Sequence, residues 1–125
     1  MIKIEQKFLI ALRKGWLAKN AGGFWFKIPD APTSKQVAKP FDAFSVSDRV
    51  SIAWEAKQTT KKTFTMKDLR QSQIDGLSRV VANGWIAFVA IYFTDVKKYM
   101  IVPFSFLTLH GKVDRDDFEM VDIKI

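Results

Sequence analysis

An uninterrupted apolar run, WIAFVAIYF from Trp85 to Phe93, limits the folds that are open to this chain. A strand with one wet face alternates apolar and polar side chains, whereas a strand that is buried on both faces does not. The run is also too short to cross a membrane as a helix. We therefore predict that it forms a central strand, covered on both faces by other parts of the chain.

Two helices are predicted from apolar residues at helical spacing and from stop signals. The first spans residues 2–19 and ends at Asn20, which is followed closely by two glycines. The second is expected to begin at Thr65, which can form a capping box with Asp68, and to end at Asn83 before a glycine. Both helices are expected to pack on the sheet that contains the central strand.

The remaining elements complete a mixed sheet. Residues 41–47 and 50–57 alternate like the two strands of a hairpin with its turn at residues 47–49. The other predicted elements are strands over residues 24–28, 99–102 and 118–125, an exposed loop over 29–40 and a short helical turn over 103–109. The predicted fold class is α/β, with a mixed central β-sheet flanked by helices, in one domain that spans residues 1–125.

Composition excludes several kinds of site. The chain has no cysteine and one histidine, His110, so neither a disulfide nor a thiolate or histidine-rich zinc site can form. Any metal ion must therefore be held by oxygen ligands. Charged side chains interrupt the apolar residues near the start, and no apolar stretch approaches the length of a membrane span. We therefore expect a cytoplasmic protein that makes no membrane contact.

The charge balance favours an anionic polymer as the partner. The chain carries 20 Lys and Arg residues against 13 Asp and Glu residues, a formal net charge of +7 at pH 7. A broad basic surface gains affinity for nucleic acid because it releases many counterions at once. The alternative is that the charge only keeps a small domain soluble.

Three charged side chains stand where alternation predicts buried strands. Asp42 begins the first hairpin strand and Glu55 lies near the end of the second, so antiparallel pairing brings both to the same end of the sheet. Lys57 is two residues beyond Glu55 and projects from the same face. Converging carboxylates repel each other unless a cation lies between them, and oxygen ligands completed by water suit Mg²⁺. The alternative is a structural ion pair of Glu55 with Lys57 or Arg49.

Polar and basic residues follow the predicted site directly. The run QTTKK begins just after Lys57 and has the donors and charges that bind phosphates. The side chains expected to contact DNA are Lys35, Lys39, Thr59, Lys61, Lys62, Lys67 and Arg70. The predicted metal site and the predicted phosphate contacts therefore coincide.

The spacing of these residues resembles a known nuclease signature. Asp42, twelve intervening residues and then EAK at residues 55–57 look like the PD-(D/E)XK pattern, which implies a restriction-endonuclease-like core. The succession of KPFDAF, WEAKQT, a basic loop, LRQSQIDGL and a long apolar strand is similar to the RecU-like and the archaeal or phage Holliday-junction resolvases. The resemblance extends from Glu5 to about Phe106, and the ordered succession is more specific than any one short motif.

The resemblance implies a Mg²⁺ site in which Mn²⁺ is able to substitute. Its ligands would be Asp42, Glu55 and the backbone carbonyl of Ala56. Lys57 would act on the attacking water or on the scissile phosphate. Glu5, on the first helix, would face the same metal ion; the alternative is a solvated first-turn residue that the helix dipole favours.

Gln73 matches a glutamine of these resolvases and would be a further catalytic residue; the alternative is a partly buried side chain tied to the backbone. The implied activity is a metal-dependent, structure-selective endonuclease that resolves four-way DNA junctions by paired symmetric nicks and leaves 5′-phosphate and 3′-hydroxyl ends. Two symmetric cuts need two sites related by a two-fold axis, so a homodimer is expected. The expected setting is a prokaryotic or phage-infected cell, with branched DNA and no small molecule as the substrate.

Two other functions stay open. One is another nuclease of the same fold, which would cut flaps or duplex DNA. The other is a nucleic-acid-binding module that keeps the fold without cleavage. Converging carboxylates beside a bound phosphate argue against the binding module, because they would only weaken its affinity for DNA.

Overall fold

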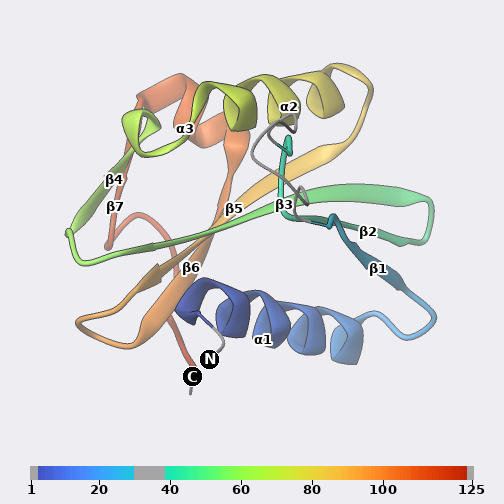
Figure 1. Ribbon diagram of the computed structural model, residues 1–125, viewed down its shortest axis with the longest axis horizontal. Coiled ribbons are helices and arrows are strands. Elements are labelled where there is room, and N and C mark those ends of the chain that lie inside the picture. Colours follow the sequence, from blue (N-terminus) through green and yellow to red (C-terminus); the bar gives the residue numbers. More distant parts are fainter. Residues whose placement is uncertain (1–2, 30–38, 124–125) are drawn as a thin grey trace.

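The computed structural model describes residues 3–29 and 39–123 (Figure 1). Most of the predicted loop and the last two residues of the predicted final strand lie outside this part of the chain. The elements are α1 (Ile4–Lys19), β1 (Phe24–Lys27), β2 (Ala43–Ser47), β3 (Val50–Thr59), β4 (Thr63–Thr65), the 3₁₀ turn η1 (Met66–Asp68), α2 (Gln71–Ala82), β5 (Ile86–Phe93), β6 (Lys98–Pro103), α3 (Phe104–His110), β7 (Lys112–Asp114) and β8 (Val121–Asp122).

Six of the strands form one mixed sheet in the order β1-β2-β3-β5-β6-β8. β3 and β5 are parallel, whereas the other neighbouring strands are antiparallel. A parallel pair needs a crossover connection, and here the crossover contains α2. β5 lies between β3 and β6 and is buried along most of its length, so the predicted central strand and the predicted fold class are confirmed.

Helices cover both faces of this sheet, with α1 on one side and α2 and α3 on the other (Figure 1). Phe8 of α1 belongs to one buried apolar cluster together with Trp54 of β3. Leu77 of α2 belongs to a second cluster together with Ala53, the residue before Trp54. Because side chains alternate along a strand, Glu55 projects toward the α2 side, like Ala53.

The β2–β3 hairpin fixes the register at the site. Its turn consists of Asp48 and Arg49, which have φ angles of 47° and 67°. A turn with two such residues has the twist that suits a tight hairpin, as predicted for this segment. It places Ala43 opposite Trp54. β3 extends to Thr59, beyond its predicted end, because its last residues pair with β5.

The predicted start of the second helix is wrong. The backbone N–H of Thr65 donates to Asp68 Oδ2 at 2.9 Å, but this capping box closes only the turn η1. Leu69 then returns to extended backbone, and its side chain is buried in the core. α2 begins two residues later, where Gln73 Oε1 accepts the backbone N–H of Arg70 at 2.9 Å.

Two short strands have no counterpart in the sequence-based prediction. β4 pairs antiparallel with β7, and the hydroxyl of Thr63 donates to Asp114 Oδ1 at 2.6 Å. This pair joins residues that are 51 positions apart, so no local hairpin signal could reveal it. Among the described residues of the predicted final strand, only β8 forms, in which Val121 pairs with Tyr99.

Candidate active site

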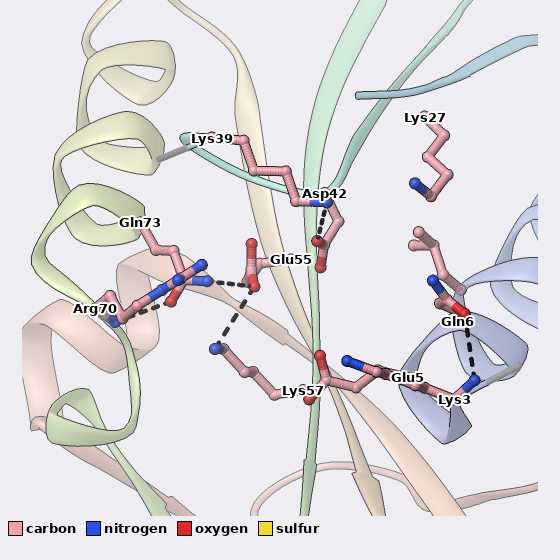
Figure 2. A pocket seen from close by; sticks show the side chains of 11 residues that line it. Lys3, Glu5, Gln6, Lys27, Lys39, Asp42, Glu55, Lys57, Arg70 and Gln73 are labelled. Carbon is pink, nitrogen blue, oxygen red and sulfur yellow. Dashed lines mark hydrogen bonds and ion pairs between the residues drawn. The ribbon is translucent and has the colours of Figure 1, made fainter. Parts of the chain in front are cut away.

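Asp42 and Glu55 face each other across the hairpin. Beyond the pair of Ala43 and Trp54, the backbone N–H of Asp42 donates to the Trp54 carbonyl at 2.9 Å. This bond interrupts the regular ladder, because Asp42 and Ala43 then both lie against Trp54, and it leaves the carboxylate of Asp42 beside that of Glu55. The structure thus brings the two carboxylates to the same end of the sheet, as the hairpin predicts (Figure 2).

Asp42 also covers the edge of β3 at the end of its pairing with β2. Its Oδ2 accepts the backbone N–H of Ala56 at 2.8 Å. The N–H and C=O groups of one strand residue point to the same side, so the Ala56 carbonyl is directed toward this edge as well. The other oxygen of Asp42 lies 3.3 Å from the ammonium of Lys39. The predicted metal ligands, Asp42, Glu55 and the Ala56 carbonyl, therefore lie together at the edge of β3 where its pairing with β2 ends.

Glu55 is almost fully buried, with 2% of its surface exposed. Gln73 Nε2 donates to its Oε2 at 2.8 Å, and the Lys57 ammonium lies 3.8 Å from the same oxygen. The other oxygen, Oε1, is buried and has no hydrogen-bond partner in the described part of the chain. Burial and, after it, the charge of Asp42 raise the pKa of Glu55 to about 9, against the opposing charge of Lys57.

These groups fit a Mg²⁺ ion. A buried carboxylate oxygen without a partner is unfavourable until a donor or a cation reaches it. Asp42, Glu55 and the Ala56 carbonyl offer hard oxygen donors, and Mg²⁺ commonly takes one or two carboxylates and keeps several waters. Among residues 3–29 and 39–123, no three Asp, Glu, His or Cys side chains gather closely enough to hold a metal ion. The protein ligands are therefore too few for a metal cage but sufficient for a hydrated Mg²⁺.

Lys57 and Glu5 complete the polar walls. Lys57 projects from the same face of β3 as Glu55, and 17% of its side chain is exposed. Glu5 lies in the first turn of α1, and its carboxylate accepts a hydrogen bond from the backbone of Gln58. Burial raises the pKa of Glu5, and the nearby charge of Lys57 opposes this shift. Glu5 is thus a first-turn residue that is half-buried in the wall of the site.

Together these side chains line a cavity of about 200 Å³ (Figure 2), here named the site pocket. Its cationic side chains are Lys3, Lys27, Lys39, Lys57 and Arg70, and its carboxylates are Glu5, Asp42 and Glu55. The excess of cations suits a phosphodiester, which carries one negative charge per nucleotide.

Three polar residues of the site pocket, Lys3, Gln6 and Lys27, are absent from the sequence-based site. Lys27 ends β1 and pairs with Ala43, the neighbour of Asp42. The signal that could have found Lys27 is the pairing of the first predicted strand with the hairpin. Lys3 and Gln6 are two residues and one residue from Glu5, and helix residues at these spacings do not share a face, so the predicted role of Glu5 did not point to them.

The structure divides the predicted DNA contacts. Lys39 and Arg70 line the site pocket. Thr59, Lys61, Lys62 and Lys67 do not, because they lie where β3 leads into β4 and η1. There the Lys61 ammonium pairs with Asp68 at 2.8 Å. Lys35 lies outside the described residues.

Gln73 has the tie to the backbone that the alternative describes, and it also contacts the predicted site. Its Oε1 is tied to the backbone N–H of Arg70, and its Nε2 donates to the candidate metal ligand Glu55. Glu55 in turn pairs with Lys57, one of the two ion pairs considered as a structural alternative. The ion pair does not account for the unpartnered Oε1 of Glu55, so it leaves the metal interpretation standing.

Residues 36–123 match the model of a known family, described as RecU, Recombination protein U. The match covers well over half of the chain and includes Asp42, Glu55, Lys57 and Gln73. The chain belongs to the RecU family. Glu5 lies before the matched segment.

Curated proteins include relatives of this RecU-family chain. It is 39% identical over 57 residues to the Holliday junction resolvase RecU of Lactococcus lactis subsp. cremoris. That alignment covers 45% of this chain and 27% of the relative. It is also 33% identical over 78 residues to the Holliday junction resolvase RecU of Streptococcus suis. This second alignment covers 62% of this chain and 38% of the relative. The alignments thus span about a third of the length of these curated relatives.

The RecU-family chain also shares its fold with a solved structure. Hjc of Archaeoglobus fulgidus, described as a Holliday junction resolvase from an archaeal hyperthermophile, superposes with a TM-score of 0.58 at 19% identity, over 90% of this chain and 93% of Hjc. The predicted restriction-endonuclease-like core is therefore confirmed at the level of the fold. In the described part of the RecU-family chain, every helix is too short or too polar to cross a membrane.

Proposed function

We propose that this RecU-family chain is a metal-dependent endonuclease that cuts four-way DNA junctions. The observation that carries the proposal is the buried Oε1 of Glu55, which has no hydrogen-bond partner in the described residues. The carboxylate to which it belongs lies beside the carboxylate of Asp42. Paired carboxylates in a pocket rich in cations suit metal-assisted phosphodiester cleavage. The names of the curated relatives, Holliday junction resolvase RecU, support the junction as the substrate.

The proposed Mg²⁺ would be held by Asp42, Glu55 and the backbone carbonyl of Ala56, and Mn²⁺ would substitute for it. When bound, such an ion lowers the pKa of a coordinated water and neutralises charge on the scissile phosphate. Gln73 occupies Oε2 of Glu55, which leaves Oε1 for the ion. Glu5 remains a proposed additional ligand from α1.

Lys57 is the proposed catalytic cation. Its ammonium lies beside Glu55 and lines the site pocket, where it can donate to the attacking water or to a non-bridging phosphate oxygen. Arg70 lines the same pocket and can bind the negative charge of the DNA backbone. In the proposed reaction the water oxygen bonds to phosphorus as the bond to the 3′ oxygen breaks. The products would be 5′-phosphate and 3′-hydroxyl ends.

Paired symmetric nicks would require a homodimer with a two-fold axis. An aromatic surface supports this part of the proposal; Phe24 and Phe26 are its exposed members, and Phe44 and Trp85 are half-buried. Phe24 and Phe26 are 54% and 43% exposed. Ring contacts of 5.3 to 6.2 Å join both to Phe44, and a contact of 5.8 Å joins Phe44 to Trp85. Exposed apolar patches of this kind are typical of interaction surfaces.

One assay tests the proposed activity. Purified protein is mixed with end-labelled four-way, flap and linear duplex DNA of related sequence, in Mg²⁺ or in EDTA. We expect cleavage of the four-way junction in Mg²⁺ alone. Equal cleavage of flaps or linear duplex would indicate another nuclease of the same fold. Tight binding without cleavage in Mg²⁺ would indicate a binding module.

A further inference from the structure

A second cavity of about 200 Å³ lies beside the site pocket, between α1 and the edge strand β1. Its lining consists of Gln6, Leu9, Ile10, Arg13, Trp25 and Lys27. The helix positions follow the i, i+3, i+4, i+7 spacing of a single stripe, and the strand positions are two apart, so each set shares one face. We refer to this cavity as the α1–β1 groove.

The walls of the groove are aromatic on one side and aliphatic on the other. The Trp25 ring contacts the rings of Trp16 at 6.1 Å and Trp54 at 5.4 Å, which hold it in place on the β1 side. On the α1 side Leu9 is buried, whereas Ile10 is 44% exposed. A flat heteroaromatic ring can stack on an indole that is fixed in this way and pack against the aliphatic side chains.

The groove continues directly from the site pocket. Both cavities share Gln6, Leu9 and Lys27 as lining residues. Arg13 and Lys27 add positive charge to the apolar lining, a combination that suits a nucleotide strand more than a purely apolar partner. A second copy of this chain, with a formal charge of +7, would bring further positive charge to the same place.

We propose that the α1–β1 groove binds the unstacked nucleobase of the nucleotide next to the scissile phosphate. Trp25 stacks on the base, Ile10 packs against it, and the Gln6 amide supplies a hydrogen-bond donor and acceptor for the base edge. This inference rests on the proposed function, because it requires that DNA occupies the site pocket.

The groove would contribute to the choice of substrate. A base leaves the duplex stack at a free-energy cost that is smallest where its pairing is already interrupted. In a continuous duplex that cost opposes entry into the groove, whereas at a branch point, where stacking between neighbouring pairs is interrupted, the cost is lower. The groove would therefore favour branched or otherwise interrupted DNA over intact duplex.

The test is a binding experiment in EDTA, in which no cleavage occurs. Fluorescence anisotropy measures the affinity of each variant for an intact four-way junction and for junctions that lack one base at a time near the branch point. The groove variants are Ile10→Ala and Trp25→Leu. The matched control is Ile4→Ala, because Ile4 is also 44% exposed on α1 but does not line the groove.

Both groove variants should bind the intact junction about tenfold more weakly, the size of effect that stacking of one base supplies. Wild-type protein should bind about tenfold more weakly to the junction that lacks the base bound in the groove. The groove variants should bind this abasic junction as tightly as they bind the intact junction. Ile4→Ala should behave like wild type on every junction. Trp25→Leu keeps an apolar side chain against Trp16 and Trp54. If Trp25→Leu fails to fold, Ile10→Ala still tests the groove.

Three results would overturn the inference. If the loss of affinity from a groove substitution adds to the loss from base removal at every abasic position, no base occupies the groove. The proposed nuclease activity would stand in that case. A change in the solution mass of the DNA-free groove variants would show instead that the groove is a contact between copies. Failure of wild-type protein to bind any junction would remove the proposed function together with the inference.

Discussion

The carboxylate of Asp42 accepts the backbone N–H of Ala56 at 2.8 Å, at the point where the β2–β3 ladder ends. One oxygen of this side chain thus satisfies a strand N–H, while the negative charge lies beside Glu55. Asp42 is therefore both a structural acceptor and a candidate metal ligand. A substitution that keeps the acceptor but removes the charge separates these two roles.

Asp42→Asn should abolish cleavage and leave junction binding unchanged or tighter. The asparagine amide keeps an oxygen that can accept the Ala56 N–H, so the hairpin is expected to remain folded. Loss of the negative charge removes a metal ligand and also a group that repels phosphate. Cleavage of a labelled junction in Mg²⁺ and anisotropy in EDTA measure the two effects. Equal losses in both measurements would contradict a metal-ligand role for Asp42.

Glu55→Gln should stabilise the metal-free protein at neutral and alkaline pH. The pKa of Glu55 is about 9 in the folded protein, above the ordinary value of 4.5 that applies in the unfolded chain. Between these values the unfolded chain releases a proton that the folded protein keeps. The free energy of unfolding therefore falls as pH rises, by at most about 1.4 kcal/mol per pH unit from this group.

Urea denaturation of wild type and Glu55→Gln in EDTA, across the range from acid to pH 9, measures this difference. The two proteins should differ least below pH 4.5, where glutamate is protonated in both states. The advantage of the variant should then grow up to about pH 9. A constant difference across this range would show that Glu55 does not titrate as its burial predicts.

Lys57→Ala should lower the rate of cleavage by about 10²- to 10³-fold, as loss of one donor to a charged transition state commonly does, with a small effect on affinity. Lys27→Ala is the matched control, because Lys27 lines the same pocket from β1 and does not pair with Glu55. It should weaken binding more than it slows the single-turnover rate. A Lys57→Ala enzyme with near-normal turnover would remove Lys57 from the mechanism.

Arg70→Gln should weaken binding to all DNA sequences and reduce the slope of log affinity against log salt by about one unit, because one phosphate contact is lost. The double variant Lys61→Gln, Lys62→Gln extends the test beyond the site pocket, to the segment where Lys61 pairs with Asp68. A slope reduced by about two units would place DNA along β3 and η1. An unchanged slope for the double variant would confine the DNA to the site pocket side.

Much of the fold follows from local sequence signals. The apolar run of β5 shows that the strand is buried on both faces, and alternation in β2 and β3 gives the hairpin that brings Asp42 beside Glu55. The predicted start of α2 is wrong because Thr65 and Asp68 do form a capping box, but one that serves the turn η1. Burial of Leu69 decided the outcome, and a capping motif carries no information about such tertiary packing.

The parts of the site that sequence reasoning missed depend on contacts between distant elements. Lys27 reaches the site pocket because β1 pairs with β2, and Lys3 because α1 crosses the opposite face of the sheet. Neither contact has a local signature. The unpartnered oxygen of Glu55 is also invisible in the sequence, because it depends on how Gln73 and Lys57 share the other oxygen.

Cleavage of a supercoiled plasmid that extrudes a cruciform tests the central claim, a metal-dependent resolvase that makes two coupled cuts. Solution mass is measured in parallel, with and without junction DNA. We predict a dimer that converts the plasmid directly to linear product in Mg²⁺, with no cleavage in EDTA or by Glu55→Gln. A monomer that accumulates nicked circles, and that cuts a plasmid without the cruciform equally well, would contradict the claim.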